Sequence, residues 1–401
     1  MLLQLSSDQE NFRETTARFL TGRVPIEEIR RLRDDVAGFD PDYWRSGAQL
    51  GWTSLLVSEE NGGGTISDSG LVDLTVLAHE FGLRAAPGPL VPTNVVAAAL
   101  NSVGGEAHAP VLESLLSGES TASWCYGEPA PHDRLGHVEL QCRVEGGDIV
   151  LSGVKRPVES AAQAAHLLVT ARAAEGLTQV LVPADTAGVS VEPMKTVDLT
   201  RRFSVVRFDN VRVPLAAVVG EVGGAAEQIE RQLQLAVVIL NAEAVGAMQA
   251  AFDMTVQWAF DRYSFGRPLA SYQELKHRFA DMLAWLEASH AINDQAAAAV
   301  EAHSPDAEEL VSAAKAFIGA YGCELAQDCV QIHGGIGLTY EHDLHIYLRR
   351  VTADRALYGT PAEHRQRITA VAEHLKGQSR RDDGLLAQTE AMVPGSLKET
   401  A

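Results

Sequence analysis

Three regions of the chain differ in the spacing of their apolar residues. In residues 1–118 the apolar positions recur at helical spacing, and the Gly62-Gly63-Gly64 triplet marks a turn between helical stretches. From residue 119 to residue 222 the spacing changes to two, in short Val-rich runs separated by Gly, Asp and Pro. The predicted strands are Asp148–Val154, Leu167–Ala171, Gln179–Pro183, Val189–Val191 and Ser204–Val213. The pattern predicts a helical N-terminal domain followed by a compact antiparallel sheet or barrel.

Residues 223–378 return to helical spacing, with much longer elements. Ala225–Phe260 and Tyr272–His303 are two nearly uninterrupted helical patterns. Ser304 is a predicted N-cap, with Pro305 at the first position of a third long helix.

A last helix has the clearest start in the chain. Thr360 and Glu363 have the spacing of a capping box, in which each side chain bonds the other residue's backbone amide. The polar segment 379–401 is expected to form a flexible tail. We therefore expect an α+β chain with domains at 1–118, 119–222 and 223–378.

Charge and cysteine content narrow the function classes. The 53 acidic residues against 33 basic ones give a net charge of −20, which argues against binding to nucleic acid or to an anionic membrane. The longest apolar run, Leu235–Leu240, is far shorter than the roughly 20 residues of a membrane span. The four cysteines have no metal-binding spacing and fit a reducing cytoplasm; they are Cys125, Cys142, Cys323 and Cys329.

A segment rich in arginine and aromatic residues separates the first two long helices. It reads Arg262-Tyr263-Ser264-Phe265-Gly266-Arg267-Pro268-Leu269 and is followed by Gln273. A corner between helices accounts for its glycine and proline, but not for two arginines that flank an aromatic ring. A guanidinium binds a pyrophosphate through two hydrogen bonds, and a neighbouring Phe can stack on a planar ring. The segment therefore favours nucleotide binding.

A glycine-rich segment follows the third long helix. It reads Gln331-Ile332-His333-Gly334-Gly335-Ile336-Gly337. The C-terminus of a helix needs only one glycine, so three glycines in four positions indicate close approach of the backbone to a ligand. The pattern is not G-x-G-x-x-G and follows no predicted strand, which disfavours a Rossmann site.

Together with the helix–sheet–helix order, these segments resemble the acyl-CoA dehydrogenase family of flavoproteins, over about residues 5–376. The similar segments are Arg262-x-x-Phe265-Gly266-x-x-Leu269 with Gln273, Gln331-x-x-Gly334-Gly335, and Gly359-Thr360 at the end of the family's Y-E-G-T. The resemblance implies an N-terminal helical domain, a β-barrel-like middle domain and a C-terminal four-helix bundle, assembled as a dimer of dimers. It also implies FAD, oxidation of an acyl-CoA to the 2-enoyl-CoA, and an electron-transferring flavoprotein as acceptor.

In this family each FAD lies across two subunits, so the resemblance divides the cofactor-binding residues into two sets. The residues that this chain donates to a neighbour's FAD are Arg262, Ser264, Phe265, Leu269, Gln273, Gln331, Gly334 and Gly335. The residues that it keeps for its own flavin pocket are Trp124, Tyr126, Gly127 and Thr360. We call the first set the donated residues.

The chain departs from the family at the catalytic base. The family's usual base is the Glu of Y-E-G-T, but here Tyr358 stands in its place. A tyrosine, with a pKa of about 10, is a poor base at neutral pH. The position that bears the Glu in some members, on the long helix before the arginine-rich segment, is Ala236. Glu243, seven residues further along that helix, is a weaker candidate for a relocated base.

The middle region departs from the family as well. The flavin-contacting turn, usually T-E-P or S-E-P, reads Gly127-Glu128-Pro129 and lacks the hydroxyl. In the next strand Pro157 replaces an aromatic ring that flanks the flavin, and Glu159 replaces a hydroxyl near its reactive edge. An ionised carboxylate at that edge disfavours an anionic reduced flavin.

The family residues that this chain lacks all belong to the set that a subunit uses for its own flavin, whereas the donated residues all match the family pattern. This division leads to the hypothesis that the chain is one partner of a heteromeric α2β2 acyl-CoA dehydrogenase. The alternatives are a self-sufficient homo-oligomeric dehydrogenase with a relocated base, an acyl-CoA oxidase and a structural subunit.

Overall fold

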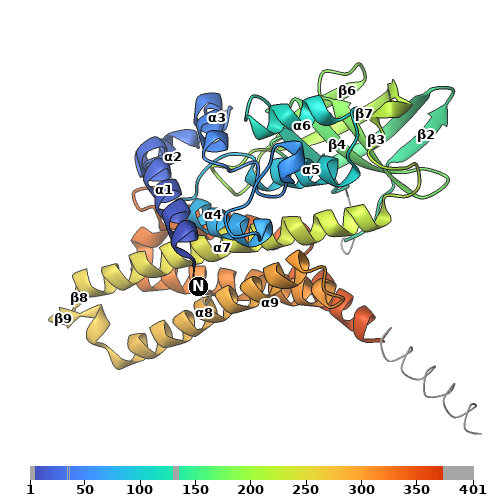
Figure 1. Cartoon of the computed structure of the whole chain (residues 1–401). Coiled ribbons are helices and arrows are strands. Elements are labelled where there is room, and N and C mark those ends of the chain that lie inside the picture. The colour runs from blue at the N-terminus through green and yellow to red at the C-terminus, as the bar shows by residue number, and fades with distance from the viewer. Residues whose placement is uncertain (1–4, 34, 36, 130–134, 374–401) are drawn as a thin grey trace, which may run out of the picture.

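The computed structural model describes residues 5–33, 35, 37–129 and 135–373, so the predicted tail at 379–401 lies outside the described residues (Figure 1). Helices come first along the chain. They are α1 (Ser7–Arg23), α2 (Ile26–Leu32), α3 (Pro41–Gln49), α4 (Gly70–Leu83), α5 (Leu90–Val103) and α6 (Ala109–Leu116). Between α3 and α4, the predicted turn at Gly62 has a left-handed backbone, with φ of +85°.

The second region is a seven-stranded sheet that lies to one side of the helices (Figure 1). Its strands are β1 (Ala122–Cys125), β2 (Gln141–Glu145), β3 (Asp148–Glu159), β4 (His166–Arg172), β5 (Leu177–Pro183), β6 (Val189–Met194) and β7 (Phe203–Pro214). The strand order is β1-β4-β2-β3-β7-β6, and β5 pairs with the other edge of β4. The apolar side chains between its strands form a core of their own.

The prediction of an antiparallel sheet is wrong in one respect, because the sheet is mixed. Strand β1 runs parallel to β4, with Ala122 opposite His166, and β2 also meets β4 in parallel. The remaining strand pairs are antiparallel. All four residues of β1 are buried, so this strand has no alternation of apolar and polar residues that the sequence could reveal.

Long helices form the third region. They are α7 (Ala226–Asp261), α8 (Gln273–Glu301), α9 (Ala307–His333) and α10 (Leu344–Ala356), followed by a helical segment at 361–373. In Figure 1, α7 crosses the molecule, with α4 and the sheet on one side and α8 and α9 on the other. Helix α7 is long and apolar enough to span a membrane, but 89% of its most apolar window is buried inside the protein. We therefore assign α7 as the central core helix.

Two glycines bring α4 and α7 into backbone contact. A Cβ added at Gly82 on α4 would lie 1.9 Å from the carbonyl oxygen of Glu243 on α7. A Cβ added at Gly246 on α7 would lie 2.1 Å from the carbonyl oxygen of His79 on α4. Side chains at these positions would push the helices apart, so the glycines determine how closely the N-terminal helices pack on the core helix.

The predicted helix starts are confirmed at one position and wrong at another. The amide of Glu363 donates to the Thr360 hydroxyl over 3.3 Å, and the amide of Thr360 donates to the Glu363 carboxylate over 2.7 Å, which is the predicted capping box. In contrast, α9 begins at Ala307 with Asp306 as its N-cap. Ser304 lies one turn earlier and accepts from the amide of Ala307 with its carbonyl oxygen.

Candidate functional site

The arginine-rich segment forms a short hairpin at one end of the molecule (Figure 1). The hairpin pairs β8 (Tyr263–Ser264) with β9 (Arg267–Pro268), and the carbonyl oxygen of Arg262 closes it by accepting from the amide of Leu269 over 2.9 Å. At its tip Phe265 has a left-handed backbone, with φ of +48°, and a side chain that is 97% exposed. The chain thus holds an aromatic ring in solvent in a conformation that non-glycine residues seldom adopt.

The glycine-rich segment lies at the C-terminal end of α9. Helix α9 ends at His333, Gly334 has a positive φ of +69°, and the turn continues as the 3₁₀ helix η4 (Gly334–Leu338). Gln331, Gly334 and Gly335 are exposed. Exposed backbone and small side chains leave this turn accessible to a ligand or to another chain.

Trp258, near the end of α7, connects the two segments. Its ring stacks on the His333 ring, with 5.0 Å between the centroids, and the guanidinium carbon of Arg262 lies 6.0 Å from the Trp258 ring centroid. The structure therefore brings the two donated segments together, although Arg262 and Gly334 are 72 positions apart in the sequence. Sequence reasoning found both segments but not this connecting tryptophan.

A separate cleft of about 600 Å³ lies between the sheet and the segment that follows α10. The residues that line it are Trp124, Tyr126, Gly127, Glu128, Leu135, Arg156, Pro157, Glu159, Phe203, Ala356, Leu357, Tyr358, Gly359, Thr360, Ala362 and Glu363. They include all four residues predicted for the chain's own flavin pocket. Ala236 does not line this cleft and is fully buried in the core.

Three aromatic rings form a stack along the cleft wall. Trp124 stacks on Tyr126, with 4.6 Å between ring centroids, and on Tyr358, at 5.8 Å. The indole N–H of Trp124 donates to the Thr170 hydroxyl over 3.1 Å, and the Tyr126 hydroxyl accepts from the amide of Gly136. These rings therefore bind one another on the wall of the cleft where the family pattern places flavin contacts.

Tyr358 is not suited to act as a base. Burial raises the pKa of its phenol well above the ordinary value, and the nearby Glu159 carboxyl raises it further. Its backbone is left-handed, with φ of +55°, and its carbonyl oxygen is 2.9 Å from Nε2 of His364. The phenol therefore stays protonated at neutral pH, and the residue acts as a wall of the cleft.

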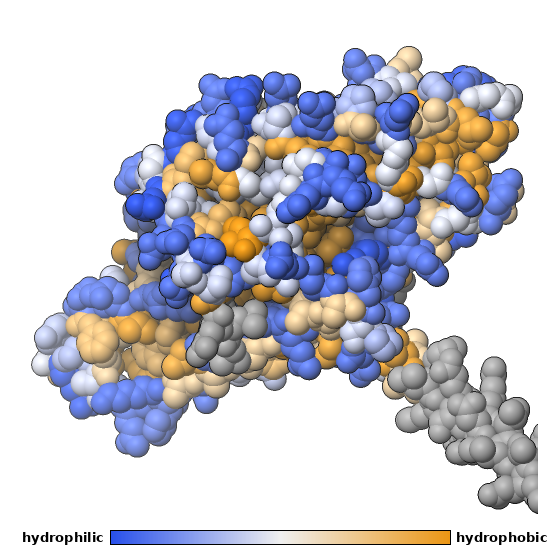
Figure 2. Space-filling view, in the orientation of Figure 1, coloured by the Kyte–Doolittle hydropathy of each residue, from blue (hydrophilic) through white to orange (hydrophobic). Residues whose placement is uncertain are grey.

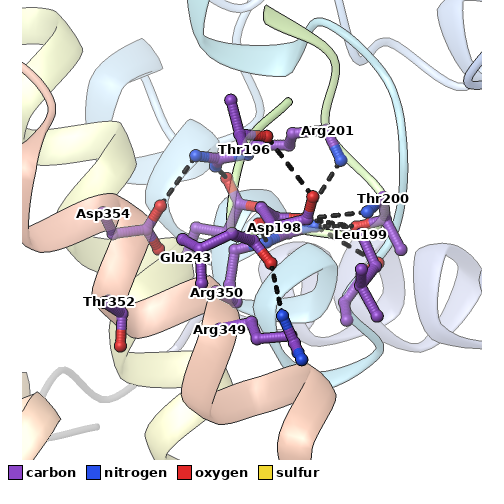
Figure 3. Close-up of polar contacts among 12 residues, drawn as sticks. Thr196, Asp198, Leu199, Thr200, Arg201, Glu243, Arg349, Arg350, Thr352 and Asp354 are labelled. Atoms are coloured by element: carbon purple, nitrogen blue, oxygen red, sulfur yellow. Dashed lines mark hydrogen bonds and ion pairs between the residues drawn. The ribbon is translucent and has the colours of Figure 1, made fainter. Parts of the chain in front are cut away.

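Glu243, the candidate for a relocated base, does not line the cleft. Figure 3 shows its side chain among those of Asp198, Arg350 and Asp354. One oxygen of its carboxylate accepts from Arg201 and the other accepts from Arg350. Arg350 also donates to Asp198 over 2.6 Å, and Arg201 donates to Asp354 over 2.7 Å. Both oxygens are occupied by guanidinium groups, so the geometry disfavours Glu243 as a base.

One member of this buried cluster of charges stands out in the sequence. A glutamate inside the apolar stretch Leu235–Met248 needs buried partners. Those partners come from the loop between β6 and β7 and from α10, more than 40 residues away on either side, and periodicity contains no information about such distances. Among the described residues no group of His, Cys, Asp and Glu side chains could hold a metal ion.

Comparisons with known proteins agree with this architecture. Three family models match: acyl-CoA dehydrogenase N-terminal domain over residues 6–119, middle domain over 132–211 and C-terminal domain over 226–372. The chain belongs to the acyl-CoA dehydrogenase family, a class of FAD-linked oxidoreductases, and the predicted fold and cofactor are confirmed.

Two relatives and two solved structures illustrate the similarity. The chain is 30% identical over 368 residues to acyl-CoA dehydrogenase IpdE2 of Mycolicibacterium smegmatis, covering 91% of this chain and 99% of the relative. It is 27% identical to the Mycobacterium tuberculosis protein of the same name, covering 90% and 96%. A solved steroid ACAD variant, Tcur3481-Tcur3483, has a TM-score of 0.84 at 26% identity, covering 92% and 98%. An FAD complex of PigA shares the fold, with a TM-score of 0.83 at 21% identity, covering 93% and 99%.

The two halves of the predicted FAD site differ in how well they fit the cofactor. In the donated half, Arg262, Phe265 and the turn at Gly334 are exposed, and Trp258 contacts both Arg262 and His333, which precedes the turn. In the chain's own half, the stacked rings and the Glu159 carboxyl line the cleft where the family pattern places flavin contacts. The donated half therefore fits FAD, whereas the chain's own half departs from the family pattern at Gly127, Pro157 and Glu159.

Proposed function

We propose that this chain is the partner subunit of a heteromeric acyl-CoA dehydrogenase, assembled as α2β2 with a paralogue that carries the missing glutamate base. The reaction of the assembly is FAD-dependent α,β-dehydrogenation of an acyl-CoA thioester to the 2-enoyl-CoA, in the cytoplasm. FAD supplies the redox chemistry, with an electron-transferring flavoprotein as the final acceptor. This chain contributes Arg262, Phe265 and the turn at Gly334 to the paralogue's FAD.

One observation carries the proposal: Arg262, Phe265 and the turn at Gly334 are exposed, while neither family base position of the chain bears a glutamate. The Phe265 ring is 97% exposed, although its backbone is constrained. Such a ring contributes nothing to the stability of the isolated chain, so its contact lies with something outside the chain. A cofactor held by a neighbouring subunit satisfies that requirement.

The surface around the donated residues supports a protein partner. Large apolar or aromatic side chains are exposed on the end of α7, on the hairpin and on the segment from η4 to α10. They are Phe260, Tyr263, Phe265, Ile336, Leu338 and Tyr340. Figure 2 shows apolar surface at the end of the molecule that carries the hairpin. Contiguous apolar surface of this kind marks sites of protein–protein contact.

A similar solved structure gives this assembly a precedent. It is named for two proteins, Tcur3481-Tcur3483, and is described as a steroid ACAD. We extend from that name only the idea of a two-chain enzyme, and we leave the acyl group open. The competing proposal of a self-sufficient enzyme requires a base, and Glu243 is bound to Arg201 and Arg350 outside the cleft.

The test is to replace donated residues in the complex of this chain with its paralogue. Arg262→Ala and Phe265→Ala should each lower the flavin content of the complex and the rate of acyl-CoA oxidation, without dissociating the chains. Arg212→Ala is the matched control, because Arg212 is an exposed arginine on β7 that pairs with Glu145. Full flavin content in both variants would contradict the proposal.

A further inference from the structure

Seven ionisable side chains form one buried group beside the cleft, which we call the ion cluster. Its members are Glu159, Asp198, Arg201, Glu243, Lys315, Arg350 and Asp354, and none is more than 5% exposed. They come from β3, from the loop between β6 and β7, and from α7, α9 and α10. Figure 3 shows most of these side chains converging from the loop and the two helices α7 and α10.

Glu159 is the carboxyl group of the ion cluster that accepts no hydrogen bond from an arginine, although Oδ2 of Asp354 also has no partner within the described residues. Asp198, Glu243 and Asp354 each accept a hydrogen bond from an arginine side chain. Oε1 of Glu159 lies 3.5 Å from Nε of Arg201, and its Oε2 has no hydrogen-bond partner within the described part of the chain. Glu159 is also the only one of the seven that lines the cleft.

The charges of the ion cluster do not balance when every member is ionised. Four carboxylates then face three cations, even with Lys315 counted as charged. Tyr358, next to Glu159, adds no charge, because burial keeps its phenol protonated. Unbalanced buried charge is costly, and a buried carboxyl group avoids the cost by binding a proton. The ion cluster therefore favours one bound proton.

The contacts place that proton on Glu159. Burial raises the pKa of Glu159 to about 7, with Arg201 opposing and Glu243 reinforcing the shift. Burial also raises the pKa of Asp354 to about 7, but the 2.7 Å hydrogen bond from Arg201 favours the ionised form of Asp354. Asp198 stays ionised, because Arg350, Arg201 and two backbone amides outweigh its burial and lower its pKa to about 2.

We propose that Glu159 is a neutral carboxylic acid in mildly acidic solution and that its O–H is then a hydrogen-bond donor to the cleft, which therefore binds an uncharged group with a carbonyl or ring-nitrogen acceptor. Among the described residues, none of the other charged side chains that line the cleft is a buried acid with a free O–H to donate. Glu128 is paired with Lys155 at 2.7 Å, the Glu363 carboxylate is held in the capping box, and Arg156 is exposed.

A protonated Glu159 can replace the hydrogen-bond donor that the family pattern has at this position. The family pattern places a hydroxyl here, and a neutral carboxylic acid also donates a hydrogen bond. The acid differs from the hydroxyl in that it loses the donor and gains a negative charge when pH rises. Binding of an acceptor group in the cleft then depends on pH, with the affinity falling about tenfold per pH unit above the pKa of Glu159.

The acceptor group could belong to a flavin ring or to a thioester. Binding of two ligands to the full chain distinguishes these two sources. Riboflavin offers ring carbonyls and ring nitrogens, and butyryl-CoA offers a thioester carbonyl. We expect one of them to bind at about pH 6 and to weaken at least tenfold by about pH 8.5. Glu159→Gln keeps an N–H donor at every pH and should remove this pH dependence, whereas Glu159→Ala should abolish binding. Binding of neither probe, or binding with the same pH dependence in Glu159→Gln, overturns the proposal.

A second measurement follows the proton without any ligand. Infrared difference spectra of the full chain between about pH 6 and about pH 8.5 should show a protonated carboxyl band that is absent from Glu159→Gln. Glu192→Gln is the control, because Glu192 is an exposed carboxylate outside the ion cluster that pairs with Arg207, and this variant should keep the band. A band that persists in Glu159→Gln overturns the assignment. These experiments need neither the paralogue nor turnover, so their failure is distinct from failure of the proposed heteromer.

Discussion

Arg350 on α10 and Glu243 on α7 form an ion pair that is sealed from solvent. The pair joins the core helix to the helix that leads into the cleft segment. Asp198, from the loop between β6 and β7, binds the other edge of the same guanidinium. Arg350 thus connects the sheet region, α7 and α10. We therefore expect that replacing any of these three charged residues lowers the free energy of unfolding.

Replacing Glu243 by Gln should destabilise the chain strongly. The change leaves Arg201 and Arg350 without their shared carboxylate, and removal of one partner from a buried pair costs about 3–5 kcal/mol. Urea unfolding measures the loss. Glu192→Gln is the control, because Glu192 is exposed and 3.4 Å from Arg207, a pair worth less than about 1 kcal/mol. Equal effects of the two substitutions would show that the ion cluster does not anchor the fold.

Gly246→Ala should separate α4 from α7. The added methyl group would overlap the carbonyl oxygen of His79, and overpacking of this kind costs about 1–3 kcal/mol or more. Gly22→Ala on α1 has open space around it and should stabilise the protein by about 0.5–1 kcal/mol through helix propensity alone. Thermal unfolding of the two variants should therefore shift in opposite directions. A Gly246→Ala protein as stable as the parent would mean that the helices do not touch here.

Trp258→Leu should lower the flavin content of the complex with the paralogue. The ring holds Arg262 and His333 in place, so its loss frees both donated segments without removing a donated residue. Trp285→Leu is the matched control, since Trp285 also contacts an arginine and an aromatic ring, Arg278 and Tyr321, but lies on α8. Flavin content that falls equally in both variants would indicate general destabilisation of the helices. Trp258→Phe should restore part of the lost flavin.

The free energy of unfolding should fall as pH decreases from about 6.5 towards 4. Burial lowers the pKa of His79 to about 3, and the pKa values of His290 and His364 to about 4. In this window the unfolded chain binds protons at these histidines and the folded chain does not, so stability is present above the unfolded pKa and is lost on acidification. Urea unfolding between about pH 7 and about pH 4.5 measures the slope. His290→Gln should reduce it, and an unchanged slope in this variant would contradict the prediction.

Much of the fold could be predicted from local patterns. The long helices of the third region were predicted within one or two residues at most ends, because Ala225–Phe260 and Tyr272–His303 have strong periodicity and clear breaks. The parallel placement of β1 could not be predicted. It depends on which strand lies next to β1 in space, and four buried residues without alternation contain no such information.

The candidate site was predictable to a different degree in its two halves. The donated residues lie in two short segments with unusual composition, so the sequence alone is enough to propose them. The ion cluster joins residues from position 159 to position 354 through single hydrogen bonds, and only Glu243 stood out within an apolar helix. Arg201 and Arg350 contact Glu243 only because of the tertiary packing, which local sequence patterns do not predict.

The most direct test of the central claim is the number of flavins per chain. The chain should be purified alone and after co-expression with an acyl-CoA dehydrogenase paralogue that carries the glutamate base, and bound FAD and acyl-CoA oxidation should be measured for both. We predict no stoichiometric FAD and no turnover for the chain alone. The α2β2 complex should be active and hold one FAD per pair of unlike chains. One FAD in each chain purified alone, with turnover of acyl-CoA, would contradict the proposal.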